Sequence, residues 1–161
     1  MNPEEIQQQQ QQTQESIENT PEDKATKLRN YWTEEVQKLN ENLKSLPSVD
    51  HLINIVYTKR QEAVDNYYAT MSVYNKQYRI YKQNYAQLYN NIKSGSNGIR
   101  YTSDQAIDKQ IDAQLIAQRE VLDELNVLMS FLWETVKSID GIQYAIGNKI
   151  KIHEMMNGLK F

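Results

Sequence analysis

The sequence predicts an all-α protein: a long antiparallel helical hairpin, coiled-coil-like, with an additional N-terminal helix and closure by oligomerisation. Helix-breaking residues are scarce, with five glycines and three prolines in 161 residues and none of either between residues 48 and 93. Two long stretches carry apolar residues at alternating spacings of three and four, which is the spacing of a helix that packs lengthwise on another helix. A short glycine-containing segment, residues 94–98, separates them.

Residues 1–19 form a polar tail with six consecutive glutamines, too poor in apolar residues to fold alone, so we expect it to be mobile. Residues 20–47 predict the N-terminal helix. Thr20 is suited to cap it, Pro21 to occupy its first turn, and Pro47 to end it. Its apolar face is expected to hold Leu28, Tyr31, Trp32, Val36, Leu39, Leu43 and Leu46.

Residues 48–161 predict the hairpin. Its first arm, to about Lys93, is long enough for a helix of about 67 Å, which needs an equally long partner. Four successive positions of its apolar seam are tyrosine, whose hydroxyl must find a partner or water. The seam consists of Val64, Tyr67, Met71, Tyr74, Tyr78, Tyr81, Tyr85, Leu88 and Ile92.

The return arm is expected to begin after a cap at Thr102 or Ser103 and to continue as one helix, weakened or kinked at Gly141 and Gly147. Its seam consists of Ile111, Leu115, Gln118, Leu122, Leu125, Met129, Leu132, Val136, Ile139, Gln143, Ile146 and Ile150.

Further apolar residues lie off this seam and would stay exposed in a two-helix hairpin: Val121, Leu128, Phe131 and Trp133. Exposed apolar area of this extent indicates a covering chain, so we expect a homo-oligomer held mainly by residues 121–156. The residues assigned to oligomerisation are Val121, Leu125, Leu128, Leu132, Trp133 and Val136.

Charge is unevenly distributed. Residues 51–100 carry seven cations and two anions, whereas residues 1–50 and 101–161 are net acidic. A basic middle between acidic ends is expected of a protein with one anion-facing surface, although opposite helix faces that neutralise each other would give the same totals.

No enzyme is predicted. The two histidines, His51 and His153, lack partners at metal-ligand spacing. Asp104, Asp108 and Asp112 share a helix face, but such rows are more often solvated than metal-binding. We therefore expect no metal and no cofactor. Without cysteine, a signal peptide or a long apolar run, the protein is expected in the cytoplasm, neither secreted nor bound to a membrane.

The remaining candidate chemistry is single-stranded nucleic acid, which binds to cations along its backbone and to aromatic faces on which bases stack. The candidate nucleic-acid-binding residues are Lys76, Arg79, Tyr81, Lys82, Tyr85, Tyr89, Lys93 and Arg100, with Tyr68 as a further stacking ring. The alternative is that the tyrosines are core residues of a structural helical protein, such as a virion component or scaffold. If the cations pair with the acids of the return arm, the structural alternative is favoured.

Three segments resemble the UvsY family of recombination mediators of T-even-type bacteriophages: QYRIYKQNYAQLY at residues 77–89, the break at 94–98, and LWETVKSI at 132–139. A terminal signature follows at Tyr144, Ile146, Asn148, Ile150, Met155 and Gly158. The resemblance spans about residues 55–158, although Ile142 and Gly147 replace basic residues of the family pattern.

The resemblance implies an oligomeric protein without catalysis, active in DNA recombination and repair. Such a mediator binds single-stranded DNA and helps a RecA-like recombinase to displace single-strand-binding protein. Because several weak sites on one oligomer engage one strand, avidity replaces single-site affinity.

Overall fold

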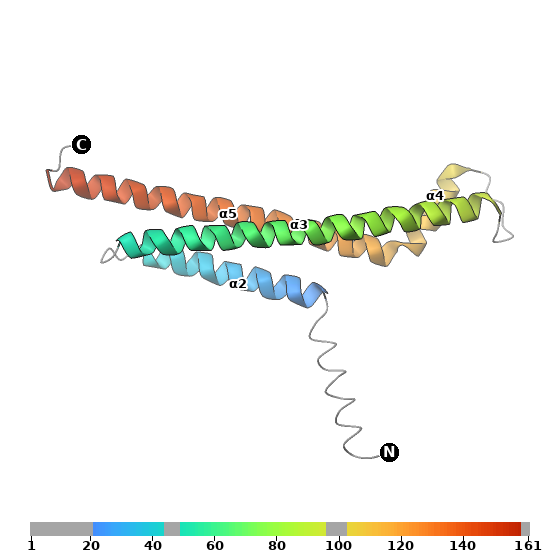
Figure 1. Ribbon diagram of the computed structural model, residues 1–161, viewed down its shortest axis with the longest axis horizontal. Coiled ribbons are helices and arrows are strands. Elements are labelled where there is room, and N and C mark those ends of the chain that lie inside the picture. The colour runs from blue at the N-terminus through green and yellow to red at the C-terminus, as the bar shows by residue number, and fades with distance from the viewer. Residues whose placement is uncertain (1–20, 44–48, 96–102, 159–161) are drawn as a thin grey trace, which may run out of the picture. The chain divides into compact units, whose positions relative to one another are not determined.

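The computed structural model describes residues 21–43, 49–95 and 103–158, and within them four helices and no strand, which confirms the all-α prediction. The helices are α2 (Pro21–Asn42), α3 (Val49–Lys93), α4 (Asp104–Gln114) and α5 (Ile116–Met156) (Figure 1). The predicted tail, the cap at Thr20 and the helix end at Pro47 lie outside the described residues. None of the described helices is long and apolar enough to cross a membrane.

Most predicted helix ends are confirmed. α3 ends at Lys93, and Gly95 follows with a φ of +73°, the left-handed conformation that closes helices and that glycine adopts without a steric penalty. The Ser103 side chain caps α4 by accepting a hydrogen bond from the Ala106 amide at 3.3 Å. α2 ends at Asn42, four residues before the expected end at Leu46.

The prediction of one uninterrupted return helix is wrong, because the arm breaks at Leu115. This residue has φ −102° and ψ 10° and separates α4 from α5. The break costs little hydrogen bonding, since the Leu115 amide still bonds the Ile111 carbonyl at 2.9 Å and its carbonyl still bonds the Arg119 amide at 3.0 Å. Beyond it, α5 continues through both Gly141 and Gly147.

The chain divides into two compact units, residues 1–66 with 131–161, and residues 67–130. The first unit packs α2 with the N-terminal part of α3 and the C-terminal part of α5. Among its described residues, ten apolar side chains are at most 4 % exposed and form its core: Ala25, Trp32, Leu39, Val56, Ala63, Leu132, Val136, Ile139, Ile142 and Ile146. In the second unit, Ile92 of α3 clusters with Ile107 and Ile111 of α4 and with Leu115.

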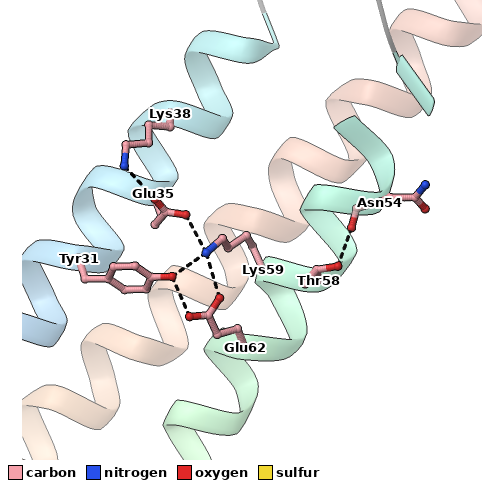
Figure 2. A network of polar contacts seen from close by, with 7 residues as sticks. All are labelled: Tyr31, Glu35, Lys38, Asn54, Thr58, Lys59 and Glu62. Atoms are coloured by element: carbon pink, nitrogen blue, oxygen red, sulfur yellow. Dashed lines mark hydrogen bonds and ion pairs between the residues drawn. The ribbon is translucent and has the colours of Figure 1, made fainter. Parts of the chain in front are cut away.

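Lys59 is the centre of a polar network that ties α2 to α3 (Figure 2). Its ammonium contacts the Glu35 carboxylate at 2.8 Å and donates to the Tyr31 hydroxyl at 2.6 Å and to Glu62 at 3.0 Å. Tyr31 in turn donates to Glu62 at 2.7 Å. Burial by itself would lower the pKa of Lys59, but the hydrogen bonds with Glu35, Tyr31 and Glu62 outweigh it and raise that pKa.

Two further polar contacts connect helices of the first unit. Arg60 of α3 donates to Asp140 of α5 at 2.5 Å. The Lys149 ammonium of α5 donates to the Leu43 carbonyl just beyond α2, which satisfies a carbonyl at the helix C-terminus that has no partner within the helix.

Three residues assigned to oligomerisation are covered by the chain itself, since Leu128, Leu132 and Val136 are 5 %, 0 % and 2 % exposed. The expectation that Leu128 stays exposed is wrong, and Leu132 belongs to the core of the first unit. The residue pattern of α5 alone could not show this, because the burial of a side chain depends on how the helices pack. Trp133 is 47 % exposed, and Val121 and Leu125 are half-buried. The long antiparallel hairpin and its oligomeric closure remain predictions.

Candidate nucleic-acid interface

Four cations lie along α3 within the second unit, and we call them the basic stretch: Lys76, Arg79, Lys82 and Lys93. All four are exposed. No acidic side chain of the described residues forms an ion pair with any of them. Arg100, the fifth predicted cation, lies outside the described residues. Because exposed cations without ion-pair partners keep their charge available to an anion, the basic stretch is a candidate binding surface.

Tyrosine hydroxyls, not cations, contact two aspartates of α4. Tyr85 donates to Asp108 at 2.5 Å and Tyr89 donates to Asp104 at 3.2 Å. The third aspartate in the row, Asp112, pairs with Arg119 at 3.5 Å. The predicted row of three aspartates therefore has partners within its own unit. In the described part of the chain, no group of three or more His, Asp or Glu side chains is placed to hold a metal ion.

Three predicted stacking tyrosines pack inward. Tyr81, Tyr85 and Tyr89 are half-buried and lie against the cluster of Ile92, Ile107, Ile111 and Leu115. Their rings thus contribute apolar contact area to the unit, as the structural alternative expects. The more exposed rings near the basic stretch are Tyr68, at 56 %, and Tyr78, at 41 %.

Two lysines of the basic stretch contact tyrosines of their own helix. The Lys82 ammonium is 5.4 Å from the centre of the Tyr78 ring. The Lys93 ammonium is 5.1 Å from the centre of the Tyr89 ring and donates a hydrogen bond to the Tyr89 hydroxyl at 3.2 Å. The two pairs are eleven residues apart, about 16.5 Å along one helix face. The sequence carries this signal as two Tyr-x-x-x-Lys repeats, which the analysis of single residues missed. These contacts hold both cations close to the helix surface.

The titration of the Tyr85 hydroxyl tests its hydrogen bond to Asp108. The hydrogen bond to Asp108, together with burial and the carboxylate charge, raises the pKa of Tyr85 from 10.0 to about 12. The neutral phenol therefore stabilises the fold below pH 10, and this contribution is lost as the pH rises through 12. Ultraviolet titration of the eleven tyrosines should lose its latest component in Tyr85→Phe. In Asp108→Asn the same component should move to lower pH, and an unchanged titration there would contradict the contact.

No protein-family model, curated protein or solved structure matches the chain.

Proposed function

We propose that the protein is a non-enzymatic single-stranded-DNA-binding recombination mediator, acting in the cytoplasm of a phage-infected host cell. It binds the strand on the basic stretch. Its protein partners are a single-strand-binding protein and a RecA-like recombinase. One observation carries the proposal. No acidic side chain of the described residues forms an ion pair with Lys76, Arg79 or Lys82, although α4 of the same unit has three aspartates.

The chemistry of the basic stretch suits a flexible polyanion. Lys76, Arg79 and Lys82 follow one another at about 4.5 Å along the helix, and Lys93 lies about 16.5 Å further on, so an extended strand along α3 can meet several cations. Tyr68 exposes ring area on which bases of any identity can stack. Four cations give weak binding at moderate salt, and repetition of the site in an oligomer compensates through high effective concentration.

A helical scaffold without nucleic-acid binding is the second candidate. It is favoured by the packing of Tyr81, Tyr85 and Tyr89 against apolar side chains, where a DNA-stacking role would leave the rings open. The two candidates differ in what they require of Lys76, Arg79 and Lys82, since a scaffold needs these cations only for solvation.

The decisive experiment removes three cations of the basic stretch. Lys76→Ala/Arg79→Ala/Lys82→Ala is expected to lower affinity for a labelled single-stranded oligonucleotide and to flatten its salt dependence. Each phosphate contact contributes about 0.7 to the slope of log affinity against log salt, so the slope should fall by about 2. Fluorescence anisotropy at several salt concentrations measures both quantities.

A matched control removes the same charge elsewhere. Lys24, Lys38 and Lys109 are exposed and lie outside the basic stretch, so changing all three to alanine should leave most of the salt slope in place. Equal losses of affinity in both triple variants would show that binding depends only on the net charge of the protein. If the wild-type protein does not bind the oligonucleotide at low salt, the DNA-binding proposal is rejected and the scaffold candidate remains. Mediator activity is then tested by recombinase loading onto strands coated with single-strand-binding protein.

A further inference from the structure

One face of α5 in the first unit carries a regular pattern that its own unit does not bury. Six residues follow one another at spacings of three and four: Lys137, Asp140, Tyr144, Gly147, Lys151 and Glu154. Tyr144 is 73 % exposed, and the Lys137 and Asp140 side chains are 55 % and 45 % exposed. A tyrosine this exposed leaves a large apolar ring in water, which is typical of an interface residue.

Gly147 lies at the edge of a groove between α3 and α5. The groove has a volume of about 220 Å³ and is lined by Ile53, Val56, Tyr57, Gln143, Ile146, Gly147 and Ile150. A β-carbon placed on Gly147 would meet no atom within 4 Å, so the glycine leaves open space where another side chain would fill it. The groove is apolar with one amide, which suits an aromatic ring.

The six-residue face is complementary to itself in the antiparallel direction. If a second copy of α5 runs antiparallel with Tyr144 opposite Gly147, the same register places Asp140 opposite Lys151 and Lys137 opposite Glu154. The large side chain then meets the smallest one, and both charged positions meet the opposite charge. A two-fold axis repeats each of these three matches, so six complementary contacts result from one register.

We propose that this face is the contact surface of a symmetric dimer, in which Tyr144 of each copy enters the groove beside Gly147 of the other. The occupant is a second copy of this chain. The charges along the face are positive, negative, positive and negative, so a copy that runs in the opposite direction places an opposite charge at every charged position. The ion pairs that Lys137 and Asp140 form within the chain do not prevent dimer formation. Lys137 contacts Glu134 at 2.7 Å and Asp140 contacts Arg60 at 2.5 Å, and both ion pairs are open to solvent.

The face lies within residues 121–156, the range predicted to hold an oligomer, but none of its six residues is among those assigned to oligomerisation from the sequence. The proposal does not depend on nucleic-acid binding. Its energy comes from Tyr144, since burying an aromatic ring in a preformed groove removes apolar area from water at a small entropy cost. The charge pairs lie at the rim and select the register, because any other register places like charges opposite each other or leaves Tyr144 outside the groove.

A cross-linking experiment tests the register directly. The chain has no cysteine, so Asp140→Cys/Lys151→Cys introduces the only two thiols. They are eleven residues apart on one helix, about 16.5 Å, which is too far for a disulfide within the chain. Mild oxidation should convert most of the protein into a covalent dimer, whereas each single-cysteine variant should stay largely uncross-linked. A double variant that cross-links no better than the single variants overturns the register.

Filling the groove tests the contact of Tyr144. Gly147→Leu is expected to raise the dimer dissociation constant at least tenfold in sedimentation equilibrium, while circular dichroism stays helical. Gly141→Leu is the matched control, because Gly141 is also a glycine inside α5 whose β-carbon would meet nothing within 4 Å, and it lies off the six-residue face. Wild-type protein that is monomeric at every concentration, or a dimer unaffected by Gly147→Leu, overturns the proposal.

Discussion

Changing Leu132 to aspartate should unfold the first unit. The Leu132 side chain is fully buried, at 0 % exposure, in the same core as Trp32, Val136 and Ile139. Removing a buried leucine costs about 2–5 kcal/mol, and an unpaired buried carboxylate adds several more. Because a domain of this size is stable by only about 5–15 kcal/mol, the variant should lose most of its cooperative unfolding transition. Circular dichroism during chemical denaturation measures this loss.

Val127→Asp is the matched control, since it makes a similar change at a position in α5 that is 55 % exposed. It should unfold close to the wild-type midpoint. A Leu132→Asp protein that keeps its helix content and its unfolding midpoint but has a lower mass would show instead that Leu132 holds an oligomer together, as the sequence alone predicts.

The second large effect is expected for Lys59→Met. Its loss would leave Glu35 and Glu62 close together without the cation between them, in a place where Lys59 and Glu35 are only 23 % and 15 % exposed. Because the network is half-buried, we expect the free energy of unfolding to fall by about 1–3 kcal/mol, between the values for surface and buried ion pairs. Lys38→Met removes a cation from the same Glu35, but Lys38 is 61 % exposed and its loss should change little. Equal effects of the two substitutions would contradict the central place of Lys59.

The pH dependence of this loss has a defined sign. The hydrogen bond from Lys59, followed by that from Lys38, lowers the pKa of Glu35 from its ordinary 4.5. The carboxylate therefore stabilises the fold above pH 4.5, and this contribution disappears as the pH falls through the lowered pKa. Lys59, whose pKa is raised, contributes below 10.5 and loses that contribution as the pH rises past its higher pKa. The difference in the free energy of unfolding between wild type and Lys59→Met should shrink as the pH falls below 4.5, and a constant difference would contradict the assignment.

Local sequence signals predicted the helices well. The stretch without glycine or proline is α3 almost to the residue, Gly95 closes it in the conformation that glycine favours, and Ser103 caps α4. The seam of the return arm also points inward, with Ile111, Leu122 and Ile146 among its buried members. These features depend on residues within one or two turns of each other, so the sequence contains them directly.

Features that depend on packing were not predictable in this way. Nothing at Leu115 signals a break, because leucine is a good helix former and the residue keeps its place in the apolar cluster. Pattern counting also could not show that the aspartates of α4 take tyrosine hydroxyls, since lysines lie at similar sequence distances from them. The burial of Leu132 depends on how the helices of the first unit pack, which the pattern of one helix does not contain.

The contacts of Tyr85 and Tyr89 with Asp108 and Asp104 have an electrical consequence. A phenol satisfies the hydrogen bonding of a carboxylate without cancelling its charge, so α4 stays negative while the neighbouring flank of α3 stays positive. Asp104 and Asp108 therefore keep their negative charge in the same unit in which Lys76, Arg79 and Lys82 lack an ion-pair partner among the described acids. For the proposed strand, this distribution of charge favours contact with the basic stretch over contact with α4.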